Sequence, residues 1–140
     1  MKTVKKKLKL KDISKTDIIN IVDIMSEFCA REIGVNRRKK RELIFNIEKK
    51  DPTNPKVYGY HDHDDNEIYI FKKRNKTLDN FIKTFIHEYT HYLQPCKTHY
   101  QRLLEKHGYE KHPYEIEAFG NEDRYFKLAY KEVKKLLILS

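Results

Sequence analysis

Glycine and proline are scarce in this sequence, with four of each among 140 residues. That scarcity argues against a disordered chain and against an array of repeats. Long hydrophobic runs are also absent: no apolar stretch approaches the roughly 20 residues that a membrane-spanning helix needs, so we expect no membrane partner. The length and a hydrophobic fraction of 39% suit one domain with a modest core, which we expect to occupy residues 1–140.

Cysteine is rare as well, since only Cys29 and Cys96 occur, far apart and in no C-x-x-C pair. The first ten residues are basic but lack the apolar segment of a secretory signal. A chain without an export signal is expected in a reducing compartment, where thiols stay free. We therefore expect a cytoplasmic protein with free cysteines and no disulfide.

Acidic residues are fewer than basic ones, 21 against 30, and the formal net charge is +9. Much of the excess lies in three clusters at Lys5–Lys11, Arg37–Arg41 and Lys72–Lys76. Such a surface favours polyanions, so nucleic acid or an acidic partner is an expected ligand. No motif that reads nucleic acid accompanies the charge, and lysine clusters also occur as plain solvated faces.

The most informative stretch is His-Glu-Tyr-Thr-His at residues 87–91, an H-E-x-x-H motif. On an α-helix, residues four apart share one face, so the imidazoles of His87 and His91 can bind one metal ion. Glu88 is displaced by one position, so its carboxylate can reach a metal-bound water without binding the metal. Two imidazoles for zinc and one carboxylate as general base are what metal-assisted hydrolysis needs.

The motif needs a helix beneath it, and the surrounding residues predict one. Thr77 or Asp79 can cap its start, and Pro95 ends it because proline lacks an N–H and clashes with the preceding turn. The apolar residues recur at spacings of three and four and form a broad stripe: Leu78, Phe81, Ile82, Phe85, Ile86, Tyr89 and Leu93.

The rest of the chain predicts an α+β domain with a short, mostly antiparallel, three-stranded sheet. Its elements are an N-terminal helix, three strands, the motif helix and a last helix, expected at residues 14–34, 42–48, 56–60, 67–71, 77–94 and 113–139. A basic, flexible leader is expected at residues 1–12. A polar, tyrosine-rich connection is expected at residues 95–112.

A catalytic zinc site needs a third protein ligand and an open position for water. The extended motif that ends in a further histidine is excluded, because Gln94 and Lys97 occupy the positions of its glycine and histidine. The remaining candidates all follow the motif helix: His99, His107, His112, Glu115, Glu117 and Glu122.

Periodicity separates the three glutamates. At about 100° per residue, Glu115 falls in the middle of the last helix's apolar stripe, whereas Glu117 falls on the polar side unless the helix phase shifts at Pro113. A carboxylate within a core-facing stripe is costly unless it is paired or binds a metal, so Glu115 is the preferred ligand. The helix dipole alone also favours a glutamate in the first turn. Glu122 shares the stripe and can orient a histidine from behind.

The motif at 87–91, followed by Pro-Tyr-Glu-Ile-Glu-Ala at 113–118, resembles the gluzincin-type zinc metallopeptidases. Minimal phage-encoded metallopeptidase domains and ImmA-type proteases look similar, with a glutamate segment on the helix after the motif helix. The resemblance implies a single zincin-like domain that hydrolyses peptide or protein substrates with one zinc ion. His87, His91 and Glu115 would be the ligands and Glu88 the general base.

The resemblance also implies that the strand before the motif helix, Glu67–Phe71, lies at the sheet edge and pairs with an extended substrate. Thermolysin-like enzymes place an acidic residue four positions after the ligand glutamate. Here that position is Phe119 from Glu115 and Asn121 from Glu117, so the comparison leaves the choice of glutamate open. No separate domain supplies a group for the oxyanion, and the candidates are Tyr89, Tyr109, Tyr114 and His112.

Two alternatives remain at this point. SprT-like proteases, which act on DNA-linked proteins, follow H-E-x-x-H with His-Gly, and His107-Gly108 lies at a comparable spacing. The second alternative is a non-enzymatic basic module that binds nucleic acid and holds a structural zinc.

Two lesser features could also bind metal. Residues 61–65 (His-Asp-His-Asp-Asp) could bind a second metal, although a polar hairpin loop is the commoner explanation. Cys96 could ligate zinc, but a structural thiol is the commoner explanation.

Overall fold

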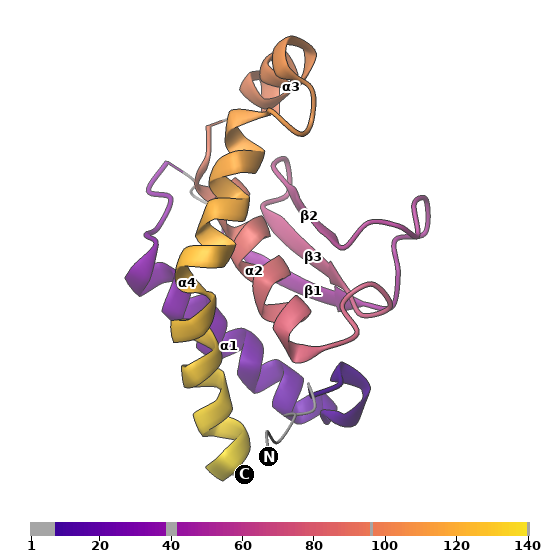
Figure 1. Ribbon diagram of the computed structural model, residues 1–140, viewed down its shortest axis with the longest axis vertical. Coiled ribbons are helices and arrows are strands. Elements are labelled where there is room, and N and C mark those ends of the chain that lie inside the picture. The colour runs from indigo at the N-terminus through magenta and orange to yellow at the C-terminus, as the bar shows by residue number, and fades with distance from the viewer. Residues whose placement is uncertain (1–7, 39–41, 96, 140) are drawn as a thin grey trace, which may run out of the picture.

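A three-stranded sheet with helices on one side forms the body of the molecule (Figure 1). The structure is a computed structural model and describes residues 8–38, 42–95 and 97–139. The elements are a 3-10 turn at Leu10–Asp12, α1 (Lys15–Glu32), β1 (Ile44–Glu48), β2 (Gly59–Asp62), β3 (Glu67–Phe71), α2 (Leu78–Leu93), α3 (Lys97–His107) and α4 (Pro113–Leu139). This is the α+β domain that the sequence predicts.

The sheet has the order β1-β3-β2, and it is mixed rather than mostly antiparallel. β2 and β3 form an antiparallel hairpin, whereas β1 pairs with β3 in parallel, from Ile44 opposite Glu67 to Glu48 opposite Phe71. The expectation that Glu67–Phe71 lies at the sheet edge is therefore wrong, because β3 is the central strand. The edge beside the motif helix belongs to β2. Its strand includes His61 and Asp62, which the sequence placed in a loop.

The motif helix α2 is the most buried element. The Thr77 side chain caps its start by accepting a hydrogen bond from the Asn80 N–H (3.2 Å), and the helix ends at Leu93, before Pro95. Its apolar stripe packs against Ile68 and Ile70 of the sheet on one side and against α1 and α4 on the other. Burial of these side chains stabilises the helix and fixes the rotation that decides where His87 and His91 point.

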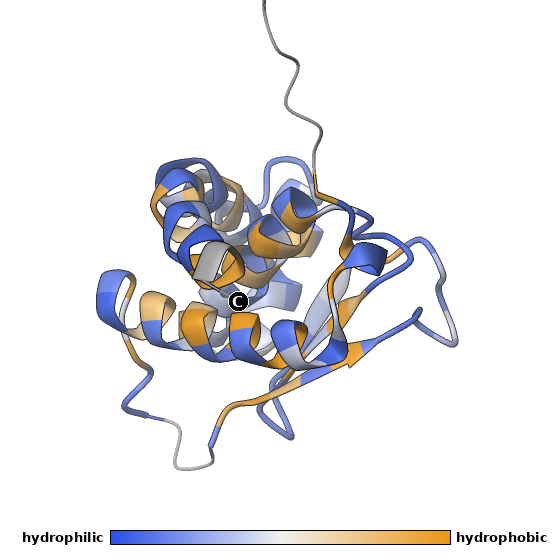
Figure 2. Cartoon of the chain, turned by 90° about the horizontal axis from the view of Figure 1, so that it is seen from below, coloured by the Kyte–Doolittle hydropathy of each residue, from blue (hydrophilic) through white to orange (hydrophobic). Residues whose placement is uncertain are grey.

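α4 runs along the molecule from the α3 end to the opposite end and packs along α2 and α1 (Figure 1). Ala118 is fully buried where α4 lies beside α2, and its small side chain lets the two helices come close. Ala129 and Val133, also fully buried, continue the contact toward the C-terminal half. In Figure 2, hydrophobic and hydrophilic residues alternate along the helices, as expected for amphipathic helices that share one core.

α3 occupies part of the connection in which the sequence analysis identified no helix. Its residues are mostly exposed, and its apolar stripe is short, formed by the half-buried Tyr100, Leu103 and Leu104, so the sequence did not indicate a helix here. The helix lies at one end of the molecule, beyond the C-terminal end of α2 (Figure 1). His112 is fully buried behind it and bonds to the Tyr100 carbonyl (2.9 Å) and the Tyr114 N–H (3.1 Å). These bonds attach α3 to the start of α4.

The described part of the N-terminal segment is anchored rather than loose. Leu10 is buried, and its N–H donates to the Lys76 carbonyl (2.9 Å), while the Leu78 N–H donates to the Leu8 carbonyl (2.9 Å). The expected flexible leader therefore does not extend through residues 8–12. Across the described ranges, no helix combines the length and apolar character that crossing a membrane requires.

Candidate metal centre

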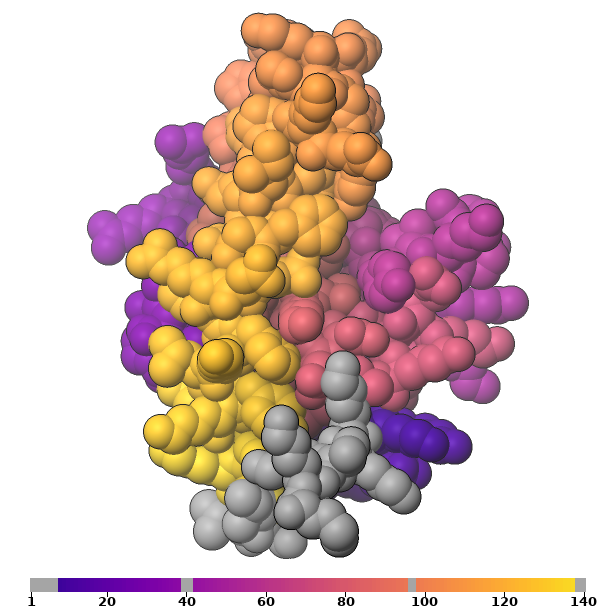
Figure 3. Space-filling model, viewed as in Figure 1, coloured from indigo at the N-terminus to yellow at the C-terminus, as the bar shows by residue number. Residues whose placement is uncertain are grey.

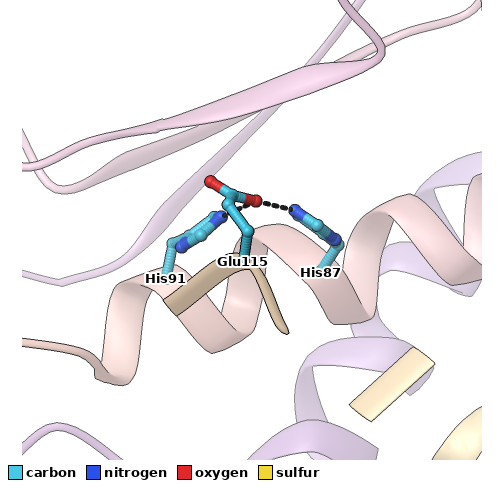
Figure 4. A group of neighbouring side chains, drawn as sticks. All are labelled: His87, His91 and Glu115. Atoms are coloured by element: carbon cyan, nitrogen blue, oxygen red, sulfur yellow. Dashed lines mark hydrogen bonds and ion pairs between the residues drawn. The ribbon is translucent and has the colours of Figure 1, made fainter. Parts of the chain in front are cut away.

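Two neighbouring helices bring three metal-binding side chains together (Figure 4). His87 and His91 lie one turn apart on α2, and Glu115 reaches them from the first turn of α4. One Glu115 oxygen, Oε1, lies 2.8 Å from Nε2 of His87 and 3.2 Å from Nε2 of His91. Because Glu115 is only 4% exposed, its charge is almost fully removed from water and depends on these partners.

The spacing of these atoms fits a small cation. The ligand atoms of His87, His91 and Glu115 all lie within 4.8 Å of one another. Zinc binds imidazole nitrogen and carboxylate oxygen at about 2.0–2.2 Å, so neighbouring tetrahedral ligands stand roughly 3.3 Å apart. The observed separations to Glu115 are close to that value, and a small movement of the carboxylate would open the space for the ion. The three residues therefore form a candidate metal site.

The outer nitrogens of both imidazoles are held by hydrogen bonds. Nδ1 of His87 lies 2.6 Å from a carboxylate oxygen of Glu122, and Nδ1 of His91 lies 2.6 Å from the side-chain oxygen of Gln94. Both partners accept, so each Nδ1 must carry the proton. Each Nε2 then points toward Glu115 and can offer a lone pair to a metal. The predicted orienting role of Glu122 matches this contact.

Gln94 is itself oriented by two acceptors. Its side-chain amide donates to the Tyr114 carbonyl (3.0 Å) and to the Glu117 carboxylate (2.9 Å). These bonds identify which end of the Gln94 amide is oxygen and turn that oxygen toward His91. Glu117, exposed and outside the metal group, therefore supports His91 through Gln94. The structure places Glu115, and not Glu117, between the histidines.

The charges of the site follow from its burial. Burial opposes a positive imidazolium at His87, but hydrogen bonds to Glu115 and Glu122 outweigh it and raise the pKa of His87 to about 10. Burial likewise opposes the Glu115 carboxylate, yet the two imidazoles outweigh it and hold the pKa of Glu115 below its usual range. With a pKa of about 10, the imidazole of His87 holds a proton on both nitrogens at neutral pH, so a binding metal ion must displace the proton from its Nε2.

Glu88 lies beside the histidines but outside the metal group, as its position in the motif predicts. Its side chain is 7% exposed and faces the same groove as His87 and His91. Burial raises the pKa of Glu88, while the two nearby histidines oppose this rise. A raised pKa makes a carboxylate a better proton acceptor near neutral pH, which is the property of a general base.

Tyr100 of α3 is a site residue that the sequence did not reveal. Its hydroxyl donates to the second Glu115 oxygen at 2.5 Å, and its ring stacks on His112 with centroids 4.1 Å apart. Burial, followed by the bond to Glu115, raises the pKa of Tyr100 and keeps the hydroxyl protonated. A tyrosine in a polar helix carries no motif, and Tyr100 is brought to the site by the fold of the α3–α4 connection, where His112 bonds to the Tyr100 carbonyl.

A groove of about 950 Å³ opens over these residues. It runs between the β2 edge on one side and α2 with the start of α4 on the other, and the metal group lies in its floor. Figure 3 shows this face, where the orange and yellow of α4 meet the magenta and pink of β2 and α2. Phe119 completes one wall, its ring edge-to-face with His87 at 4.6 Å.

The other ligand candidates lie elsewhere. His99 and His107 are exposed on α3 and do not line the groove, so the structure does not bring His107 to the motif histidines. His112 is buried and bonded to backbone groups. Among the described residues, His61–Asp65 form no second metal group: Asp62 accepts from the Asp64 and Asp65 N–H groups and shapes the hairpin loop. Cys96 lies outside the described residues.

Of the four oxyanion candidates, only Tyr109 lines the groove. Tyr89 points away, into a hydrogen bond with the Gly34 carbonyl (2.6 Å). Burial, with the charge of Glu115, raises the pKa of Tyr109 to about 12, so its hydroxyl stays a donor. Tyr109 and Tyr100 thus both place a phenol group beside Glu115.

Comparison with family models, with curated proteins and with solved structures finds no match for this chain. A function must therefore be argued from the site itself, from the types, spacing and surroundings of its residues.

Proposed function

We propose that this protein is a zinc-dependent peptidase. The observation that carries the proposal is the convergence of Nε2 of His87, Nε2 of His91 and the Glu115 carboxylate in the floor of an open groove. Two imidazoles and one carboxylate are a ligand set of catalytic zinc, which keeps one position open. Structural zinc sites are instead closed by four protein ligands, usually with cysteine.

The groove supports a polypeptide as the substrate. Its wall is β2, an edge strand of the sheet, and an edge strand offers a row of backbone N–H and C=O groups to an extended chain. A substrate bound along β2 passes directly over the three ligand residues. The order of helix, sheet, motif helix and ligand helix also agrees with the resemblance to small gluzincin-type metallopeptidases.

The chain's own residues have separate tasks in the reaction. Bound zinc supplies a Lewis acid that polarises the scissile carbonyl and lowers the pKa of a water molecule. Glu88 accepts the proton of the attacking water and passes it to the leaving amine. Tyr109, and Tyr100 if it leaves Glu115, can donate a hydrogen bond to the carbonyl oxygen as negative charge develops there. Glu122 and Gln94 keep both imidazoles in the orientation that leaves Nε2 free.

The test combines metal content with hydrolysis. Protein purified without a metal-binding tag should contain or take up about one zinc per chain, measured by elemental analysis. Glu115→Ala should lose this zinc, and His107→Ala, an exposed control, should keep it. Zinc that depends on His107 instead would favour the SprT-like site, and failure to bind added zinc would leave the basic binding module as the better proposal.

Glu88→Gln separates binding from chemistry. The amide has nearly the same shape but cannot take a proton, so the variant should keep its zinc and lose at least about 100-fold in peptide hydrolysis. Cleavage of a fluorogenic peptide library measures the loss, with zinc content checked on the same sample. Unchanged turnover in this variant would remove the proposed mechanism.

A further inference from the structure

β2 and α2 run in the same direction along the groove, so each end of the groove is lined by residues from the same end of both elements. At the start of β2, a Cβ at Gly59 would lie 3.0 Å from the side chain of Thr84, which lies in the middle of α2. Near the end of both elements, the ring of His61 contacts that of Tyr92 at 5.9 Å. The metal centre lies between these two levels. We call the end that precedes Gly59 and Thr84 the basic end; it is lined by Lys56, Tyr58, Asn80 and Lys83.

The basic end holds an anchored tyrosine, Tyr58, with the cationic side chain of Arg74 against it. The Tyr58 carbonyl accepts from the Phe71 N–H (3.0 Å) and from the Asn75 side chain (2.9 Å), so the residue is fixed to the end of β3. The Arg74 guanidinium lies 4.6 Å over the Tyr58 ring and donates to its hydroxyl (3.2 Å). Two lysines complete this end: Lys56 is exposed, and Lys83 is half-buried with Nζ 4.9 Å from the Phe126 ring.

Carboxylates are found only in the rest of the groove. Glu88, Glu115 and Glu122 line its centre, and Asp62 and Asp64 line the opposite end, whereas no described carboxylate lines the basic end. The charge therefore changes sign along the groove. A nucleic acid strand carries negative charge along its whole length, so it would meet repulsion at the centre and beyond. A polypeptide can confine its acidic residues to one side, and this favours a peptide as the occupant.

We infer that the substrate is a polypeptide with acidic residues on the C-terminal side of the bond that is cut. This inference rests on the proposed peptidase function and names the substrate class of the same site. An extended peptide pairs slightly better with β2 in the antiparallel direction. In that direction its C-terminal side leaves the metal centre toward Lys56, Arg74 and Lys83.

The position of the acidic residues follows from helix geometry. Lys83 precedes His87 by four residues and His91 by eight, which corresponds to roughly 6–12 Å along the helix axis. An extended chain advances about 3.3 Å per residue. The acidic side chains therefore belong roughly two to four residues after the scissile bond.

The test uses four synthetic peptides of one length and one central sequence. One carries three glutamates after the centre, one carries them before it, one is neutral and one carries three lysines after it. Binding to zinc-loaded Glu88→Gln protein is measured by fluorescence anisotropy, and cleavage by zinc-loaded wild type is measured as kcat/KM. The first peptide should bind and be cleaved at least about fivefold better than the neutral one in low salt, and this advantage should shrink in high salt.

Two variants locate the effect. Lys56→Glu reverses an exposed charge at the basic end and should abolish the preference. Lys127→Glu makes the same change on the exposed face of α4, outside the groove, and should keep it. Lys83→Met removes the second charge while retaining an apolar stem against Phe126. It should reduce the preference without altering thermal unfolding.

The remaining outcomes test the charge preference, the peptidase function and the class of ligand separately. Equal binding of acidic and neutral peptides, or a preference for glutamates before the centre, overturns the inference. Retained preference in Lys56→Glu also overturns it. If the peptides bind with the expected preference but none is cleaved, the proposed peptidase function falls and the charge preference of the groove stands. If an oligothymidylate displaces the acidic peptide at the same concentration as the unlabelled peptide itself, the groove is assigned to nucleic acid.

Discussion

At the scale of single residues, the site depends on groups that never face the metal position. Glu122 and Gln94 hold the outer nitrogens of His87 and His91, each at 2.6 Å. Such partners fix the tautomer and ring orientation and raise the basicity of the nitrogen that binds metal. Glu122 does so with a formal charge, which makes its hydrogen bond the stronger of the two.

Glu122→Ala should weaken zinc binding by about 10–100-fold while the fold remains intact. The reason is that His87 loses its acceptor and becomes free to turn or to change tautomer. Competition with a chelator of known affinity measures the change. The control is Asp123→Ala, which removes an exposed neighbouring carboxylate and should leave zinc affinity unchanged. Equal losses in both variants would show that net charge, and not orientation, sets the affinity.

At the scale of elements, the groove exists because β2 approaches α2 closely. A Cβ on Gly59 would stand 2.5 Å from the Tyr69 carbonyl oxygen and 3.4 Å from Cγ of Glu88. Only glycine allows this approach, which places the edge strand beside the motif helix. α3 contributes from the other end of the groove, because it supplies Tyr100, whose hydroxyl donates to Glu115.

Gly59→Ala should destabilise the protein by about 1–3 kcal/mol, because the clash involves backbone of β3 and forces β2 outward. Urea unfolding measures the change in free energy. Gly120→Ala is the matched control: its Cβ meets nothing within 4 Å in the middle of α4, so it should stabilise by about 0.5–1 kcal/mol. A neutral effect of Gly59→Ala would mean that the Gly59 backbone does not lie this close to β3 and α2.

At the scale of the whole molecule, α2 is the shared element. It packs on the sheet, on α1 and on α4, and the metal centre joins it to the start of α4. A ligand that binds only the folded state stabilises that state through mass action. Zinc bound between α2 and α4 must therefore stabilise the entire domain, not only the groove.

Zinc at 100 times its dissociation constant should stabilise the fold by about 2.7 kcal/mol, which corresponds to a rise in Tm of roughly 10 °C for a chain of this size. Differential scanning fluorimetry with zinc and with a chelator measures the shift. The Glu115→Ala variant should show almost none of it. A full shift in that variant would place the stabilising zinc elsewhere on the chain.

The sequence by itself determined the parts of the site that belong to one helix. Residues four apart on α2 must share a face, so the pairing of His87 with His91 and the offset of Glu88 followed from helical geometry. Glu115 was also identifiable, because a carboxylate in an apolar stripe conflicts with burial unless it has a partner. The strands at 44–48 and 67–71 followed from short apolar runs between turn signals.

Only the tertiary structure decided which separate segments meet. Strand periodicity does not specify neighbours, so the parallel pairing of β1 and the central position of β3 could not be inferred. The bond from Tyr100 to Glu115 and the path from Glu117 through Gln94 to His91 join residues of different elements. Sequence periodicity does not predict these contacts, because the residues become neighbours only when the chain is folded.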